Sequence, residues 1–239
     1  MSRKIPPHRF DDLVRCATEV FIARGYRHTQ MADVAEAVGV SKATLYLYVE
    51  SKEALFALCD VHADSPGPIE KPAVLPVPEP APGALAARMK QRLDREGALP
   101  LLMAGLGRAR AADIRLELAG ILHELYSAME RHCCGIKLVD RCWDHPELGP
   151  VWQELGRRQP RNHLAEYVQL RMRAGQLRIH SNPSLVARLA VETIATWAIH
   201  IKWDRSPEDF DPVAAKEAVL EYVLRGLLSE TEICKEASF

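Results

Sequence analysis

The segment SPGPIEKPAVLPVPEPAPG, residues 65–83, constrains the fold more than any other stretch of this 239-residue chain. It holds seven of the sixteen prolines, and a proline lacks the backbone N–H that a helix interior or an inner strand requires. Proline at this density favours extended backbone that acts as a semi-rigid spacer. The sequence therefore predicts a small domain at residues 8–64, a Pro-rich linker or loop at residues 65–83, and a larger domain at residues 84–230.

Both flanking regions carry the apolar spacing of amphipathic helices and lack convincing strand alternation. In the small domain the predicted helices are 9–25, 30–38, 42–49 and 52–63. Thr29, Ser41 and Ser51 are their predicted N-caps, and Gly25 and Gly39 their stops. In the larger domain the last two long helices are predicted at 183–203 and 212–229, starting after Asn182 and Asp211. The predicted fold class is all-α.

Charge and composition exclude several classes of protein. The formal net charge is −1 and the isoelectric point about 6.8, so any contact with nucleic acid must come from a local patch. No apolar run approaches the ~20 residues that span a bilayer, and the first residues lack the apolar core of a secretion signal. Six cysteines without framework spacing are typical of reduced thiols. We therefore expect a cytoplasmic protein with no membrane contact and no cofactor.

The stretch VAEAVGVSKATLYLYVESKE, residues 34–53, has the form of a helix-turn-helix, with Gly39 in the turn. The second helix would place short side chains on its first turn, where a helix approaches base edges in the major groove. Tyrosine hydroxyls and a lysine at the start of the next helix suit phosphate oxygens. The predicted DNA contacts are Thr29, Gln30, Ser41, Lys42, Ala43, Thr44, Tyr46, Tyr48 and Lys52.

The residues from about 9 to 60 resemble the DNA-binding domain of the TetR family of transcriptional regulators. The matching motifs are Gly25-Tyr26, Thr29, Val34-Ala35, Gly39-Val40-Ser41, Thr44-Leu45-Tyr46 and Ser51-Lys52-Glu53. The resemblance implies that Thr29, Tyr46, Tyr48 and Lys52 hold phosphates while Lys42, Ala43 and Thr44 face bases. Leu47 departs from the family pattern, because many relatives carry a polar residue there.

The larger domain is predicted to make a homodimer, because a two-fold dimer reads two half-sites about 34–36 Å apart on an inverted-repeat operator in double-stranded DNA. TetR-type regulators dimerise through their last two helices, which is what the resemblance implies here. Residues 138–189 also resemble AefR-like C-terminal domains. The predicted interface is Val191, Ile194, Ala195, Ala198, Ile199, Leu220, Val223, Leu224 and Leu227.

The same domain is predicted to bind an effector. Ligand pockets are lined mainly by apolar and aromatic side chains with a few polar groups. The candidate lining residues are Leu102, Met103, Leu106, His123, Tyr126, Met129, Trp143, Trp152, Tyr167, Trp197 and His200. Their aromatic content favours a small hydrophobic or aromatic effector, and the function predicted from all these features is a dimeric, ligand-responsive repressor.

Other functions remain as alternatives. The cluster of His and Cys residues at 123–145 suggests a metal- or thiol-responsive regulator, although it lacks the CxxC or HxxxH pairs of a structural zinc site. An adaptor that no longer binds DNA is a further alternative. No Gly-rich phosphate loop, nucleophile elbow or paired carboxylate points to an enzyme.

Overall fold

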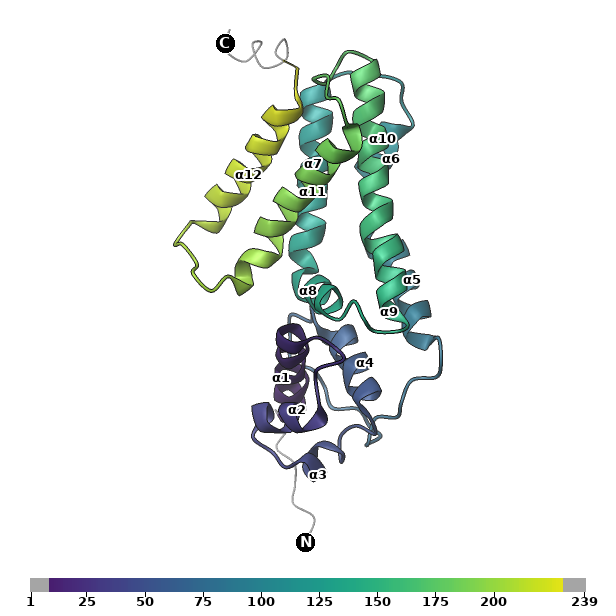
Figure 1. Ribbon diagram of the computed structural model, residues 1–239, viewed down its shortest axis with the longest axis vertical. Coiled ribbons are helices and arrows are strands. Elements are labelled where there is room, and N and C mark those ends of the chain that lie inside the picture. Colours follow the sequence, from purple (N-terminus) through teal and green to yellow (C-terminus); the bar gives the residue numbers. More distant parts are fainter. Residues whose placement is uncertain (1–8, 230–239) are drawn as a thin grey trace. The chain divides into compact units, whose positions relative to one another are not determined.

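The computed structural model describes residues 9–229, so residues 8 and 230 of the predicted domains and Cys234 lie outside it. The described residues form helices and no strand, which confirms the all-α prediction (Figure 1). The chain divides into two compact units. The first contains the residues up to Arg92 together with Cys134–Gln153, and the second contains Leu93–Cys133 together with the residues from Glu154 onward.

The first unit is built around the small N-terminal domain. Its helices are α1 (Arg9–Arg24), α2 (Met31–Val38), α3 (Lys42–Leu45), α4 (Lys52–His62), most of α5 (Ala84–Glu96) and α8 (Cys133–Arg141), and α9 (Leu148–Val151). α1 packs against α2 and α4 over a core that includes Phe21, Leu45 and Phe56, all fully buried. The Phe21 and Phe56 rings pack edge to face with 5.1 Å between centroids, a favourable aromatic geometry.

The helix ends of this domain follow local hydrogen-bonding rules. Ser41 and Ser51 cap α3 and α4 by accepting hydrogen bonds from the backbone N–H groups of Thr44 and Ala54, as predicted. Gly39 ends α2 in the left-handed conformation, with a φ of 71°. The predicted cap Thr29 is wrong. The N-cap of α2 is Gln30, whose backbone N–H is held by Asp33, while the Thr29 hydroxyl donates instead to the Gly25 carbonyl.

The Pro-rich segment is free of helix, as predicted, but it does not behave as a free linker. The Val77 N–H donates to the Tyr48 carbonyl at 2.8 Å, and the Glu50 N–H donates back to the Val77 carbonyl at 3.0 Å. Farther back, the Ile69 side chain is buried and its N–H donates to Asp11 at 3.0 Å. Both halves of the Pro-rich segment therefore pack against other residues of the first unit. We call this segment the strap (residues 65–83).

The first unit also takes in residues that the sequence assigned to the larger domain. The buried Asp60 carboxylate of α4 accepts a hydrogen bond from Arg92 of α5 at 3.1 Å. Asp64 accepts from the first N–H groups of α8, and Arg141 at the other end of α8 donates to the Ile22 carbonyl at 2.9 Å. The predicted domain boundary at residue 83 separates the partners of these contacts. Because they lie far apart in sequence, their spacing along the chain does not show that they meet.

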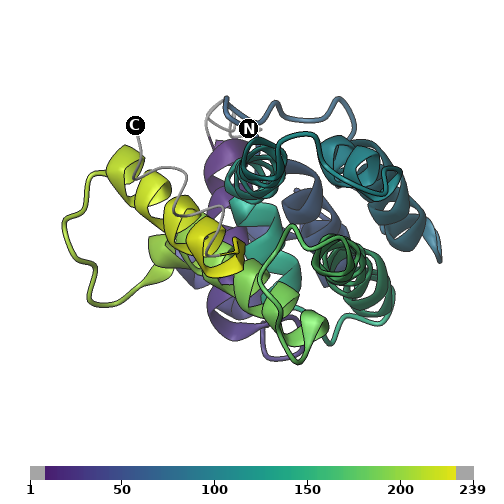
Figure 2. The ribbon, with the colours of Figure 1, turned by 90° about the horizontal axis from the view of Figure 1, so that it is seen from above.

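The second unit is a bundle of long helices. They are α6 (Pro100–Leu106), α7 (Ile114–Arg131), α10 (Gln159–Arg173), α11 (Pro183–Ala198) and α12 (Pro212–Leu227), with a 3-10 turn η2 (His200–Trp203). α10 continues from a π-helical segment, η1 (Trp152–Arg158). α11 packs against α7, α10 and α12, and Figure 2 shows α12 lying along it. Asn182 and Asp211 cap α11 and α12 as predicted.

A buried ion pair joins three of these helices. The Arg171 side chain of α10 is fully buried, and its guanidinium donates to Glu117 of α7 at 2.7 Å. It also donates to the carbonyls of Gly105 and Arg108 at the end of α6. The Tyr167 hydroxyl donates to the same carboxylate at 3.0 Å. Burial alone would raise the pKa of Glu117, but the hydrogen bonds from Arg171 and Tyr167 lower it overall.

Removing the carboxylate of this pair should destabilise the second unit strongly. We expect Glu117→Ala to lower the free energy of unfolding by about 3–5 kcal/mol, because a buried guanidinium loses its counterion. Glu154→Ala, which removes the exposed partner of Arg158, is the matched control and should change stability by less than about 1 kcal/mol. Urea unfolding followed by circular dichroism measures both. Equal losses in the two variants would contradict the assignment.

Candidate nucleic-acid interface

The turn between α2 and α3 presents the first residues of α3 to solvent. The Val40 N–H donates to the Ala35 carbonyl at 2.9 Å, which closes the turn behind Gly39. The Ser41 and Thr44 hydroxyls lie 2.8 Å apart and fix the first turn of α3. Lys42 and Ala43 are exposed on that turn. A short capped helix with small side chains at its start is suited to approach base edges.

α3 is shorter than the predicted helix at 42–49, because it ends at Leu45. The N–H groups of Leu47 and Tyr48 bond to carbonyls three residues back, and the next residues pair with Val77 of the strap. This tightening rotates the following side chains away from ideal helical positions. Tyr46 is 40% exposed and Leu47 61% exposed, whereas Tyr48 is only 1% exposed.

Three predicted contacts therefore need correction. Thr29 and Tyr48 are buried, so neither side chain is accessible to a phosphate; Tyr48 instead lies beside Phe10, with ring centroids 6.3 Å apart. The Lys52 ammonium donates to the carbonyls of Tyr26 and Thr29 at 3.1 and 3.3 Å and lies 4.3 Å from the centre of the Tyr26 ring. In this state Lys52 holds the loop before α2 rather than facing solvent. Gln30 is exposed at the start of α2.

A cluster of polar and aromatic side chains supports this loop from inside. The Tyr26 hydroxyl donates to Glu53 at 2.6 Å. The buried imidazole of His145, from the turn before α9, stacks on Phe56 at 4.8 Å and meets Tyr26 at 4.4 Å between ring centroids. His145 Nδ1 accepts from the N–H groups of Glu147 and Leu148, while its Nε2 is buried with no hydrogen bond inside residues 9–229.

Burial sets the charge state of this cluster. Desolvation lowers the pKa of His145, so the neutral imidazole is favoured in the folded state. Burial alone would raise the pKa of Glu53, but its hydrogen bond from Tyr26 and the charge of Lys52 lower it overall. Burial, followed by the hydrogen bond to Glu53, raises the pKa of Tyr26. A neutral histidine beside an ionised glutamate is the state that the geometry stabilises.

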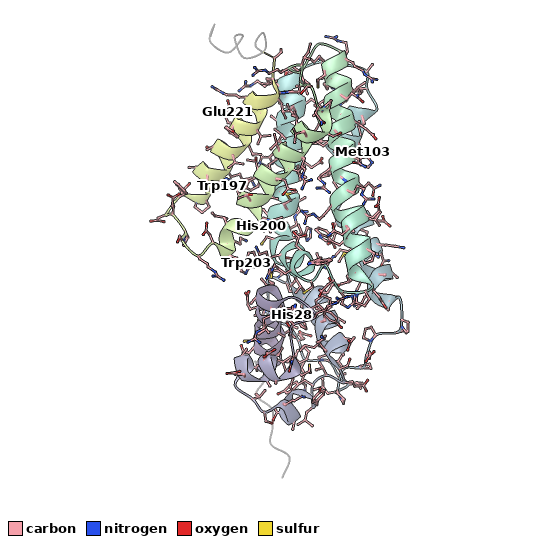
Figure 3. All side chains as sticks on the ribbon, in the orientation of Figure 1. His28, Met103, Trp197, His200, Trp203 and Glu221 are labelled. Carbon is pink, nitrogen blue, oxygen red and sulfur yellow. The ribbon has the colours of Figure 1, made fainter. Side chains whose placement is uncertain are left out.

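The residues predicted to form an effector pocket do not gather at one place. Trp143 and Trp152 belong to the first unit and the other nine residues to the second. Met103, on α6, and Trp197, on α11, lie on different sides of the second unit (Figure 3), and Met103, His123 and Trp143 are exposed. The inward members, such as Leu102, Tyr126 and Tyr167, are core residues. Spacing along single helices could not reveal which faces meet.

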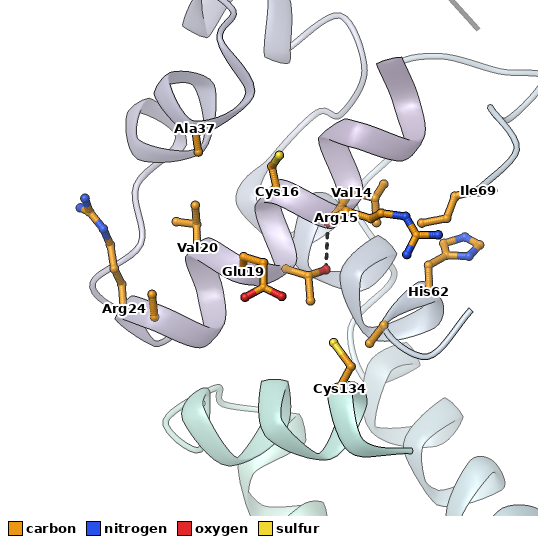
Figure 4. A pocket seen from close by; sticks show the side chains of 13 residues that line it. Val14, Arg15, Cys16, Glu19, Val20, Arg24, Ala37, His62, Ile69 and Cys134 are labelled. Atoms are coloured by element: carbon orange, nitrogen blue, oxygen red, sulfur yellow. Dashed lines mark hydrogen bonds between the residues drawn. The ribbon is translucent and has the colours of Figure 1, made fainter. Parts of the chain in front are cut away.

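The structure does contain a pocket of about 480 Å³ in the first unit, lined by none of the predicted pocket residues. Figure 4 shows it beside α1, where Val14, Val20 and Ile69 are apolar lining residues and Arg15 and His62 are polar ones. The hydroxyl of Thr18, another lining residue, donates back to the Val14 carbonyl at 2.8 Å. All but one of its lining residues lie in the N-terminal domain and the strap, and the exception is Cys134 of α8.

The His and Cys residues at 123–145 do not converge. The thiol of Cys133 lies 2.9 Å from Lys202, His132 lies 3.8 Å from Glu96, and His145 faces the aromatic cluster. Within residues 9–229, no group of three or more His, Cys, Asp and Glu side chains is placed to hold a metal ion. Burial raises the pKa of Cys59 and Cys142 to about 12, so both thiols are protonated at neutral pH. The metal- or thiol-responsive alternative is not supported.

The predicted dimer residues also need correction. Val191 and Leu220 are half-buried, and the other seven are buried within the chain: Ile194, Ala195, Ala198, Ile199, Val223, Leu224 and Leu227. The prediction thus identified the inward stripes of α11 and α12. The exposed apolar residues of these helices are Leu185, Leu189, Val213 and Tyr222. Leu185 and Leu189 are four residues apart, a signal that sequence reasoning overlooked.

Residues 13–59, which hold α2, α3 and most of α1 and α4, match the family model described as bacterial regulatory proteins, tetR family. These residues form a TetR-type DNA-binding domain. The domain is thus that of a DNA-binding transcriptional regulator. Among curated proteins, none matches the chain.

Solved structures of transcriptional regulators are similar to this chain over most of its length. The ketosteroid transcriptional regulator KstR2 of Mycobacterium tuberculosis is 18% identical, with a TM-score of 0.54 over 95% of this chain and 98% of that one. SCO3833 from Streptomyces coelicolor A3 is 20% identical, with a TM-score of 0.50 over 89% and 87%. At these identities the likeness establishes the fold. No helix within residues 9–229 is both long and apolar enough to cross a membrane.

Acid should destabilise the first unit through His145. The pKa of His145 in the folded state lies below the usual value of ~6.5, so the unfolded chain binds the proton first as pH falls. The contribution of His145 to stability is therefore complete above pH ~6.5. It decreases as pH drops below ~6.5, by at most about 1.4 kcal/mol per pH unit. We expect His145→Asn, which retains a side-chain acceptor, to flatten this dependence.

Unfolding by urea at pH 7, 6 and 5 measures the slope for each protein. The exposed His28, labelled in Figure 3, provides the control variant His28→Asn, which should keep the wild-type slope. A wild-type slope in His145→Asn would show that another group controls the acid response.

Proposed function

We propose that this chain is a dimeric repressor that binds an inverted-repeat operator and leaves it when a small effector binds the second unit. The observation that carries the proposal is the exposed face of α3 and the turn after it, with Lys42, Ala43, Tyr46 and Leu47 outward in a TetR-type domain. As a regulator acting on bacterial DNA, it would work in the cytoplasm.

In this proposal Lys42 and Ala43 enter the major groove, with Ser41 and Thr44 beside them. The Lys42 ammonium lies 6.0 Å from the centre of the Tyr46 ring, so the two side chains share one side of α3 and form one surface. Lysine donates to guanine base edges, and a tyrosine hydroxyl donates to phosphate. Gln30 and the N-terminus of α2 would add a second phosphate contact.

The first experiment is selection of duplex DNA from a random pool with the purified full-length protein. Recovery of an inverted repeat supports a two-fold dimer and gives the half-site spacing. Recovery of no motif above non-specific background at moderate salt would contradict an effector-free repressor and favour the adaptor alternative.

The selected site then tests the residue roles. We expect Lys42→Ala to weaken binding by about 1–3 kcal/mol and to relax specificity at one base pair of each half-site. Tyr46→Phe should weaken binding about equally for all sequences, because it removes only a phosphate donor. Lys71→Ala, an exposed lysine in the strap, is the control. Fluorescence anisotropy with matched and altered operators measures these effects, and indifference to Lys42→Ala would contradict the base contact.

The proposed dimer uses the outward face of α11 and α12. Leu189 is 59% exposed and Tyr222 74% exposed, and these helices pack on each other within one chain. Two such pairs joined face to face would form a four-helix bundle that buries both residues. The proposal thus keeps the predicted helices and replaces the predicted residues with the outward ones.

A charge on this face should separate the subunits. We expect Leu189→Glu to convert the dimer to a folded monomer in analytical ultracentrifugation and to lower operator affinity at least about tenfold, because a monomer contacts one half-site. Met103→Glu on α6 introduces the same charge at a residue 49% exposed and should stay dimeric. If Leu189→Glu remains a dimer, another surface forms the interface.

A further inference from the structure

Leu47 is a large apolar side chain at the surface of the helix-turn-helix. It is 61% exposed, whereas Leu45 and Val49, two positions away on either side, are fully buried. An exposed leucine gives up the favourable burial of its apolar surface. Single exposed leucines occur on most proteins, so the position of Leu47 in the fold decides what it can contact.

The backbone fixes Leu47 in this outward position. Its N–H donates to the Thr44 carbonyl at 3.1 Å, and the next N–H, of Tyr48, donates to the Leu45 carbonyl at 3.0 Å. The Tyr48 carbonyl in turn accepts from the Val77 N–H of the strap at 2.8 Å. The segment is therefore ordered before any partner arrives, which lowers the entropy cost of a contact.

Leu47 lies beside the residues that face bases in the proposed function. The Tyr46 N–H donates to the Lys42 carbonyl at 3.2 Å, so the helical turn of α3 continues to Tyr46. With three to four residues per turn, Leu47 follows Ala43 and Thr44 by one turn. Ala43 and Leu47 are both exposed. The reading surface of α3 thus extends beyond its last helical residue.

The chemistry of leucine selects one kind of contact on duplex DNA. Its side chain has no donor or acceptor, so it cannot bond to a phosphate oxygen or to a polar base edge. The apolar group that base edges present in the major groove is the C5-methyl group of thymine. The exposed Glu50 follows three residues later, and its carboxylate accepts from the Glu79 N–H at 3.2 Å. Carboxylates here repel phosphates, which favours the groove over the backbone for Leu47.

We propose that Leu47 is a specificity-determining residue that contacts the C5-methyl group of a thymine in each half-site of the operator. The contact removes apolar surface of both molecules from water, and a base without the methyl group loses it. Lys42 reads a polar base edge one turn earlier, so the two residues specify different base pairs. This inference rests on the proposed function, because it names a base that the helix-turn-helix reads.

Deoxyuridine tests the contact, because it pairs like thymidine and lacks only the C5-methyl group. Each thymine of the selected operator is replaced in turn, and fluorescence anisotropy with the full-length protein measures affinity. We expect one position in each half-site where replacement weakens binding about fourfold, the effect of one buried carbon group. Replacement in both half-sites should weaken binding about fifteenfold. Equal affinity for thymine and uracil at every position overturns the proposal.

Variants of Leu47 assign the effect to this side chain. Leu47→Ala should bind the thymine operator at least about fifteenfold more weakly and show no deoxyuridine effect, because the methyl group has lost its partner. Leu47→Met, which keeps an apolar side chain of similar size, should retain the effect. Val74→Ala in the strap, at a residue 72% exposed, is the matched control and should behave like wild type. A full deoxyuridine effect in Leu47→Ala would assign the methyl contact to another residue and overturn the proposal.

The outcomes separate this inference from the proposed function. An inverted repeat that is bound tightly without any deoxyuridine effect supports the operator-binding dimer and rejects the Leu47 contact. A protein that binds no duplex with sequence preference rejects both. Circular dichroism of Leu47→Ala and Val74→Ala confirms that each variant is folded, so a loss of affinity reports on the contact.

Discussion

A helix of four residues cannot hold its conformation in water, so the surface that α3 presents depends on what surrounds this helix. Ser41 caps its start, and the backbone of Val77 in the strap pairs with Tyr48 and Glu50 just after its end. These bonds turn Tyr48 inward and leave Tyr46 and Leu47 at the surface. The proline content of the strap suits this role, because an extended segment with few N–H donors can pair at one residue without extending into a sheet.

The interior also contains groups of side chains that hold neighbouring segments in place. Lys52, Tyr26 and Glu53 satisfy one another around the loop before α2, and His145 closes this cluster as a neutral ring. In the second unit, Arg171 and Glu117 join α6, α7 and α10 with every contact short.

Several errors of the sequence prediction have one cause. Tyr46 and Tyr48 are both plausible phosphate ligands by type, but a tightened turn sends them in opposite directions. Ile194 and Leu189 lie on the same helix, and only the packing of α7, α10 and α12 determines that Ile194 is inside. Thr29 has the side chain of a cap, yet Gln30 occupies that position because the Thr29 hydroxyl bonds to Gly25. Each outcome depends on a neighbour that residue type does not specify.

The sequence by itself determined the all-α class, the helix-turn-helix with Gly39 in its turn, and the caps Ser41, Ser51, Asn182 and Asp211, because these features rest on hydrogen bonds and sterics between residues a few positions apart. Only the tertiary structure decided that the strap packs on the first unit, that α8 joins that unit, and which stripe of α11 and α12 stays exposed. Burial depends on contacts between residues distant in sequence, and amphipathic spacing shows that a helix has an apolar face without showing what covers it.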